Sequence, residues 1–245
     1  MLAAELRNPA ALIACFSVVD VEKGEQVLGQ WQDENAWWTG LEAVTENKIL
    51  LHGFSDESKG AHAGIKAVNV YSGTVAWQQP QLRYVGALEN FVVGQLVSQP
   101  EQALWLLNEN SGELIKQVEQ STTFAEQLHR FEAALQQHVQ RAVQHTEESP
   151  YFAQLASFVR RYVAVAPLSA IDYLETASHI ILGYYFRNEK GDVQQDVLVT
   201  DLAGNLVAQQ TLAAACNGLG VDNFFIFRNI LICIQNKTTL IGFVL

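Results

Sequence analysis

The sequence predicts an all-β fold, a propeller-like ring of about five small antiparallel sheets with an α-helical insertion near residues 121–161. Three observations predict it: short apolar strands recur along the chain, a turn that ends in glycine recurs between them, and one segment has a helical period instead. Of the 245 residues, 49% are hydrophobic and 17% are charged, the opposite of a disordered composition. We expect residues 1–245 to form one domain with a sizeable core.

A turn that begins with Asp or Asn and ends with glycine occurs four times. An Asx side chain can bond its own backbone two residues further on, and glycine accepts the positive φ of a tight turn. Each turn follows an apolar strand and precedes a shorter one, so each predicts a hairpin. The four segments are residues 16–24, 65–73, 104–112 and 197–204.

A second pattern precedes most of these hairpins: two apolar strands separated by a short polar break. Combined, the two patterns give a unit of four short strands about 40 residues long, which is the sequence form of a propeller blade. Five such units are expected, and two of them are incomplete. Residues 2–20 lack an earlier first strand, whereas residues 224–245 contain three strands and no closing turn.

The long interval between the third and fourth turns predicts helices. Apolar residues step by three or four through 124–143, which is the period of an amphipathic helix. Thr123 and Glu126 have the spacing of a capping box, and Pro150 predicts the end of the helix. A shorter helix is expected at 151–161. We expect the pair to pack on the side of the sheets; alternatively, it caps one mouth of the ring.

The repeated unit resembles the quinoprotein-like β-propeller repeats (PQQ-like repeats), whose pattern is an apolar strand, Asp, a turn, Gly and then Trp. Residues 68–77 are the closest match, while the Trp is absent at the equivalent positions Leu28, Lys116 and Ala208. The quinone and calcium of the quinoprotein enzymes are not implied, because the chain is short and lacks their acidic metal cluster.

The chain also resembles a bacterial domain family of unknown function, over nearly its whole length. The residues that carry this resemblance are Trp37–Trp38–Thr39–Gly40–Leu41, Leu50–Leu51–His52–Gly53–Phe54 and Asp172–Tyr173–Leu174–Glu175. This resemblance implies no activity, because none is assigned to the family.

Charge and cysteine content limit the partners and the compartment. The 15 Lys and Arg stand against 26 Asp and Glu, a formal net charge of −11, which disfavours nucleic acid and anionic membrane surfaces as partners. Cys15, Cys216 and Cys233 are odd in number and show no paired spacing, which is typical of a reducing compartment. No apolar run reaches the roughly 18 residues of a membrane helix. We expect a cytoplasmic protein.

Catalytic and metal-binding motifs are not found in the sequence. No two of its six histidines stand at i, i+4, and there is no nucleophile or phosphate-loop motif, so we expect no metal and no cofactor. Three pairs of adjacent carboxylates are expected to be solvated rather than catalytic. They are Asp33–Glu34, Asp56–Glu57 and Glu147–Glu148.

Two functional hypotheses remain. The leading one is a non-catalytic binding or scaffold domain that presents its ring face or helix pair to a protein partner, and it predicts an exposed apolar patch without a deep pocket. The alternative is a small-molecule or sugar-binding protein, or an enzyme, with an aromatic-lined central pocket, and it predicts convergent polar groups in a cleft. Its candidate residues are Trp37, Trp38, His52, Asp172, Tyr173 and Tyr184. The alternative for the aromatic ones is that they fill the wedge between neighbouring sheets.

Overall fold

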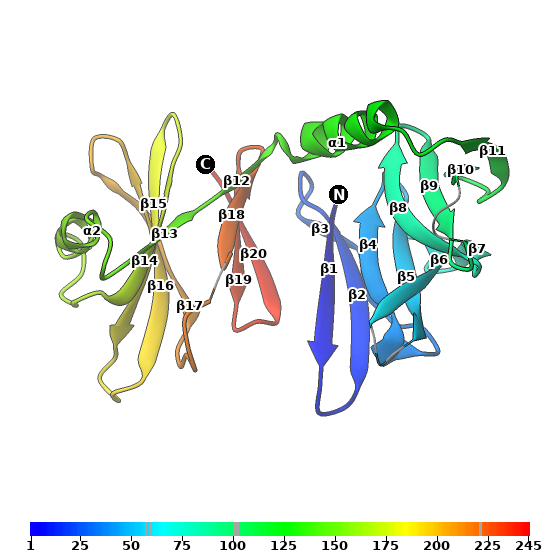
Figure 1. Ribbon diagram of the computed structural model, residues 1–245. Coiled ribbons are helices and arrows are strands. Elements are labelled where there is room, and N and C mark those ends of the chain that lie inside the picture. Colours follow the sequence, from blue (N-terminus) through cyan, green and yellow to red (C-terminus); the bar gives the residue numbers. More distant parts are fainter. Residues whose placement is uncertain (57, 59, 100–102, 221) are drawn as a thin grey trace. The chain divides into compact units, whose positions relative to one another are not determined.

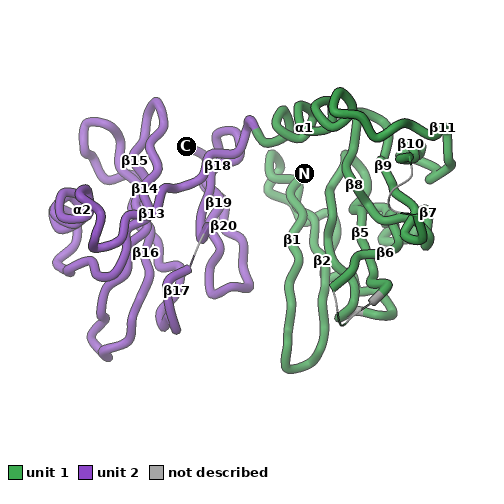
Figure 2. The backbone as a smooth tube through the Cα atoms, in the orientation of Figure 1, with its two compact units in different colours: residues 1–136 green, residues 137–245 purple. Residues whose placement is uncertain are grey.

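The computed structural model of the protein describes residues 1–56, 58, 60–99, 103–220 and 222–245, with Ala36 and Asp56 described by their backbone alone. The described residues form five antiparallel sheets and two α-helices, which confirms the all-β class and the number of sheets. The chain divides into two compact units, unit 1 at Met1–Gln136 and unit 2 at Gln137–Leu245 (Figure 2). None of the helices described is both long and apolar enough to cross a membrane.

Unit 1 contains three of the sheets and the helix α1 (Thr122–Gln136), and in each sheet successive strands are neighbours (Figure 1). The first sheet consists of β1 (Leu2–Asn8), β2 (Ile13–Asp20) and β3 (Glu25–Trp31). After the short 3-10 helix η1 (Ala36–Trp38), the second consists of β4 (Gly40–Val44), β5 (Lys48–Asp56), β6 (Ala61–Asn69) and β7 (Val75–Gln79). The third consists of β8 (Leu82–Leu88), β9 (Phe91–Leu96), β10 (Leu104–Asn108) and β11 (Leu114–Val118).

Unit 2 contains the other two sheets and the helix α2 (Phe152–Val159). One sheet has β13 (Val143–Thr146), β14 (Leu168–Glu175), β15 (His179–Arg187), β16 (Val193–Asp201) and β17 (Leu206–Ala213) in that order. The other has β12 (Val139–Arg141), β18 (Phe224–Phe227), β19 (Ile230–Gln235) and β20 (Thr239–Val244). Helix α2 packs on the apolar face of β14 and β15, where Val159 is fully buried.

The four predicted Asx–Gly hairpins are confirmed. At the second, Oδ1 of Asn69 accepts hydrogen bonds from the backbone N–H groups of Tyr71 at 2.9 Å and Ser72 at 3.0 Å. The same pair of bonds recurs at Asp20 and Asn108. The glycines that end the turns have positive φ, as expected for this position: 67° at Gly24, 68° at Gly73, 69° at Gly112 and 87° at Gly204.

Neighbouring sheets of unit 1 contact each other through these turns. Trp31 and Gln79 occupy equivalent positions, because each pairs with the residue that lies four before the Asp or Asn of its own turn. Trp31 donates a 2.8 Å hydrogen bond to the carbonyl of Gly73 in the turn of the second sheet. Gln79 donates a 2.8 Å hydrogen bond to the carbonyl of Gly112 in the turn of the third sheet. Trp77 adds a 2.8 Å bond from Nε1 to the carbonyl of Glu109. The first and second sheets are therefore each anchored to the hairpin of the following sheet.

The insertion contains two helices as predicted, but α1 is shorter than the apolar stripe indicated. It ends at Gln136, and residues 139–146 form β12 and β13 instead. Val139 pairs with Phe227, and Val143 pairs with Tyr173. β-Branched valines suit a strand, and the ladder bonds offered by two sheet edges outweigh the helical period. β12 also completes the C-terminal sheet, which the sequence predicts as three strands.

The predicted capping box of α1 is wrong. The helix begins at Thr122, so its N-cap residue is Ser121, whose Oγ accepts the N–H of Phe124 at 3.2 Å. Glu126 instead lies 3.7 Å from Arg130, one turn further on. Helix α1 packs on the third sheet through Leu128, which is buried with Val93, Leu104 and other apolar residues of that sheet.

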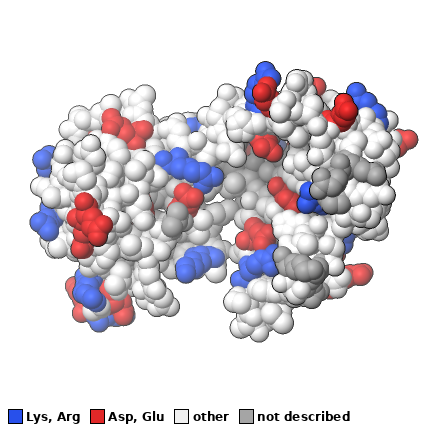
Figure 3. All heavy atoms as spheres, in the orientation of Figure 1, with Lys and Arg blue, Asp and Glu red and all other residues white. Residues whose placement is uncertain are grey.

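Charged side chains are dispersed on the surface. On the face seen in Figure 3, Lys and Arg side chains are scattered rather than gathered in one patch, and several of them lie beside Asp or Glu. Most of the view is uncharged, in keeping with the composition.

Candidate functional site

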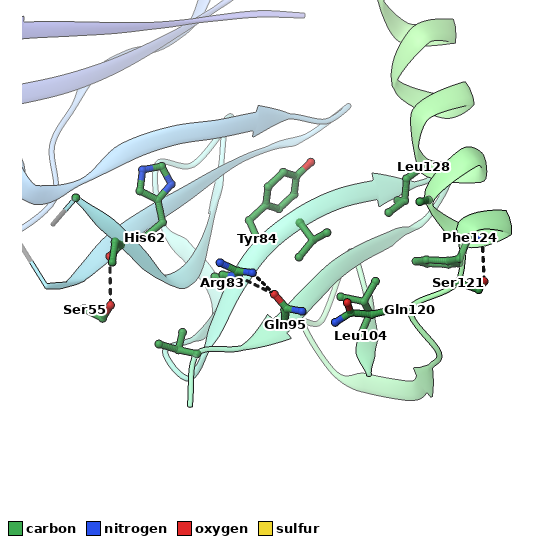
Figure 4. A pocket seen from close by; sticks show the side chains of 15 residues that line it. Ser55, His62, Arg83, Tyr84, Gln95, Leu104, Gln120, Ser121, Phe124 and Leu128 are labelled. Atoms are coloured by element: carbon green, nitrogen blue, oxygen red, sulfur yellow. Dashed lines mark hydrogen bonds between the residues drawn. The ribbon is translucent and has the colours of Figure 1, made fainter. Parts of the chain in front are cut away.

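Two clefts lie in the described part of unit 1. The first, of about 850 Å³, lies between β8, β9 and the first turns of α1, with the β5–β6 hairpin at one side (Figure 4). The second, of about 510 Å³, is lined by β5, β6 and the residues around η1. Ser55 and Val97 line both clefts, so the two are neighbours.

A fixed guanidinium lies in the first cleft. Arg83 on β8 and Gln95 on β9 are cross-strand partners, and Nε of Arg83 donates a 2.8 Å hydrogen bond to Oε1 of Gln95. Nη2 of Arg83 donates to the same oxygen. Gln95 is buried and Arg83 is exposed. Because the acceptor is a neutral amide oxygen, it holds the guanidinium in place without balancing its positive charge.

The opposite wall of the first cleft comes from α1. Phe124 and Leu128 point toward the cleft from the helix in Figure 4. Leu128 approaches β8 at Gly86, where a Cβ would lie 3.2 Å from its Cδ2, so the missing side chain lets the helix pack closely. Beside it, burial raises the pKa of Tyr84 to about 12, with the charges of Glu132 and Glu42 adding to the effect, so this hydroxyl stays protonated at neutral pH.

The second cleft contains a half-buried ion pair. Nζ of Lys66 lies 2.6 Å from both carboxylate oxygens of Asp33, and Thr39 Oγ1 donates to Oδ2 at 3.1 Å. Burial raises the pKa of Asp33, but Lys66 and Thr39 lower it by more, so the net pKa is below the ordinary value. The expectation that Asp33 is merely solvated is therefore wrong.

The other predicted carboxylate pairs differ from one another. Glu147 Oε1 accepts the N–H of Ser169 at 2.7 Å, so this carboxylate also has a structural partner, contrary to expectation. Glu57 and the side chain of Asp56 lie outside the described residues.

The aromatic candidates of unit 1 separate into two environments. Trp38 and His52 line the second cleft, and both contact Phe54 edge-on, with ring centroids 5.6 and 5.1 Å away. Trp37 instead packs against the guanidinium of Arg7, whose Cζ lies 5.2 Å from the centroid of the Trp37 ring. Trp37 is not among the described residues that line either cleft.

Beside these aromatic residues, Glu42, His52 and His62 form a cluster with one donor atom each within 4.8 Å of the others. Oε1 of Glu42 lies 2.9 Å from Nδ1 of His52 and 3.1 Å from Nδ1 of His62. The two imidazoles stack, with centroids 3.5 Å apart and planes 14° apart. Burial raises the pKa of Glu42, but the two imidazoles lower it by more, so this carboxyl ionises more readily than usual.

Two β-bulges bring this cluster together. Leu41 and Ala43 on β4 pair with successive residues of β5, so Glu42 is an extra residue without a partner there. On the other side of β5, two residues of β6 face His52, and one of them, Gly64, has φ of 80°. Bulges re-aim side chains out of strict alternation. The sequence prediction did not connect His52 with His62; their spacing of ten residues across two adjacent strands is a signal that could have done so.

The candidates of unit 2 lie in its interior or at its edge. Tyr184 is fully buried in the core, where its hydroxyl accepts from Gln209 at 3.2 Å, so it fills space between strands. Tyr173 is half-buried, and its hydroxyl donates to Glu175. Asp172 is buried, and its Oδ1 accepts from Gln144 at 2.9 Å. The six predicted residues are thus divided between the units, three in each.

Comparison with known proteins adds one similarity. Residues 1–77 match a family described as a domain of unknown function (DUF4905). The expected resemblance to such a family is confirmed over this stretch, which holds β1 to β6 and the Glu42, His52 and His62 cluster. No curated protein matches the chain.

Proposed function

We propose that unit 1 binds a small ligand with an anionic group in the first cleft. The observation that carries the proposal is Arg83, whose exposed guanidinium is positioned by the buried Gln95. The structure records no ion pair of Arg83 with a carboxylate among the described residues. The carboxylate or phosphate of a ligand can therefore accept charge-assisted hydrogen bonds from the guanidinium of Arg83.

The rest of the lining suits an organic body attached to that anion. Phe124, Leu104 and Leu128 offer apolar surface, and Tyr84 and His62 offer polar atoms (Figure 4). The volume of about 850 Å³ falls within the roughly 300–1,000 Å³ of small-molecule sites. These features favour the small-molecule hypothesis over a scaffold, for which no cleft with convergent polar groups was expected.

A thermal-shift screen tests the proposal. The probes are carboxylates and phosphate monoesters with aliphatic or aromatic bodies, and Arg83→Met removes the charge while keeping the length of the side chain. Arg130→Met, on the exposed side of α1, is the matched control. We expect at least one probe to raise the Tm of wild type and of the Arg130 variant but not of the Arg83 variant. An equal rise in all three proteins, or no rise with any probe, contradicts the proposal.

We further propose that the sheets are related to quinoprotein-like propeller repeats and that the protein is a cytoplasmic one of bacteria. The recurrent Asx–Gly turns support the repeat relationship, and the second and third of them are each contacted by a side chain of the preceding sheet in unit 1. The three cysteines are free, which suits a reducing compartment. The bacterial origin rests on the resemblance described from the sequence.

A further inference from the structure

We propose that Glu42, His52 and His62 form a binding site for a divalent transition-metal ion, with Zn²⁺ the ion that suits the donors best. This goes beyond ligand binding in the first cleft and does not depend on it. Two imidazole nitrogens and one carboxylate oxygen are a donor set that zinc uses in proteins, whereas Mg²⁺ and Ca²⁺ prefer oxygen alone.

The spacing of the donors fits one ion. In a tetrahedral zinc site with bonds of 2.0–2.1 Å, ligand atoms lie about 3.3 Å from one another. Oε1 of Glu42 lies 2.9 Å from one Nδ1 and 3.1 Å from the other, and all three donors fall within 4.8 Å. The three side chains are therefore close enough together to share one ion.

An unsatisfied nitrogen points to the same position independently. His52 is 7% exposed, and its Nδ1 has no hydrogen-bond partner among the described residues, although the Glu42 carboxylate lies close by. A buried polar atom without a partner is unfavourable, and a metal bond to the lone pair of Nδ1 satisfies it.

The two histidines play different parts. His52 is held between Gly40 and Phe54, so its ring has little freedom. The side chain of His62 is 47% exposed and can rotate. Each Nδ1 lone pair lies in the plane of its own ring, so two rings stacked at 14° cannot both aim at one ion. Binding therefore swings His62 out of the stack, while His52 and Glu42 stay in place.

Three protein donors leave a fourth position open. His62 lines the first cleft and His52 lines the second, so the ion lies where the two meet. Zinc sites with three protein ligands keep a water or an exchangeable ligand in the fourth position. A small molecule with a donor atom that enters either cleft can therefore bind the ion at this open position.

Isothermal titration of the chelator-treated chain with ZnCl₂ tests the site, with MgCl₂ as the comparison ion. We expect one Zn²⁺ per chain and no comparable binding of Mg²⁺. His62→Ala and Glu42→Gln should each weaken Zn²⁺ binding by more than the roughly 10–100-fold that loss of an outer-shell partner costs. His129→Ala, an exposed histidine on α1, is the matched control and should bind as wild type does.

Two further measurements separate this site from others. Cys15→Ser/Cys216→Ser removes the two partly exposed thiols and should leave binding unchanged. The extended X-ray absorption fine structure at the zinc edge should show nitrogen and oxygen neighbours at about 2.0–2.1 Å rather than sulfur at about 2.3 Å. Arg83→Met should also bind Zn²⁺ normally, so a failed ligand screen and a failed metal titration are distinguishable. Unchanged affinity in both the His62 and Glu42 variants, a sulfur-dominated edge, or no binding by wild type overturns the proposal.

Discussion

The imidazole of His52 occupies the space where Gly40 has no side chain. A Cβ added to Gly40 would lie 2.4 Å from Cε1 and 2.6 Å from Nε2 of that ring. The two residues are register partners on β4 and β5, so the ring lies against the neighbouring strand rather than over solvent. Gly40 is thus required here for close approach and not for its backbone conformation.

Gly40→Ala should therefore displace the His52 ring and destabilise the protein by about 1–3 kcal/mol, the usual cost of overpacking. Urea unfolding measures the loss. Gly29→Ala is the control, because a Cβ there has no neighbour nearer than 3.7 Å. Adding His52→Ala to the Gly40 variant should recover part of the loss, and a purely additive double variant would contradict the packing relationship.

Trp77→Phe should lower the free energy of unfolding by about 1 kcal/mol or more, because the indole N–H donates to the carbonyl of Glu109. The ring also packs on Gly112, where a Cβ would lie 2.5 Å from Cδ2 of the indole. Trp38→Phe is the control, since Trp38 is 38% exposed, and it should change stability by less than about 0.5 kcal/mol. Chemical denaturation of both variants compares the losses, and equal losses would show that the sheet-to-turn contact contributes nothing.

Asp172 should make unit 2 less stable as pH rises. Burial raises the pKa of its carboxyl, the hydrogen bond from Gln144 opposes this by less, and the charge of Asp222 adds to the rise. The pKa of this carboxyl is higher in the folded than in the unfolded state. Its contribution to folding stability is therefore fully present below the unfolded pKa and is lost as pH rises through the folded pKa.

Asp172→Asn should consequently be more stable than wild type at neutral pH, with the difference shrinking as pH falls toward about 4. Thermal unfolding across this range measures it. The exposed Asp192→Asn should follow wild type throughout. A variant that is less stable than wild type at pH 7 would show that Asp172 is ionised and satisfied in the folded state.

Residues 1–136 should fold as a separate chain, because the cores of the first three sheets and the contact of α1 with β8 all lie within that range. Circular dichroism should show a cooperative thermal transition. A shorter chain of residues 1–120 lacks Leu128 and should melt at lower temperature, since the apolar face of β9 and β10 is then exposed. A non-cooperative transition in the longer chain would contradict the expectation.

Local chemistry accounts for what was predictable in this fold. The Asx–Gly hairpins depend on bonds between residues two or three apart, such as Asn69 with Tyr71 and Ser72, so the sequence alone identifies them. The same applies to the number of sheets, which follows from counting strands and turns. Helix α1 was predicted too long because Val139 and Val143 keep the helical period, and only pairing with β18 and β14 decides that they are strands.

The candidate sites were less predictable, because each depends on where strands pair. Sequence reasoning selected Trp38 and His52 but not Glu42, His62 or Arg83. Arg83 becomes a fixed charge only because register brings Gln95 opposite it, and Glu42 and His62 meet His52 only through two bulges.

The sequence by itself thus determined the all-β class, the hairpin turns and the presence of helices near residue 121 onward, since these follow from interactions within a few residues. Only the tertiary structure decided which polar side chains converge, because strand register and bulges depend on the packing of distant segments, and a shift of one residue turns a side chain to the other face of its sheet.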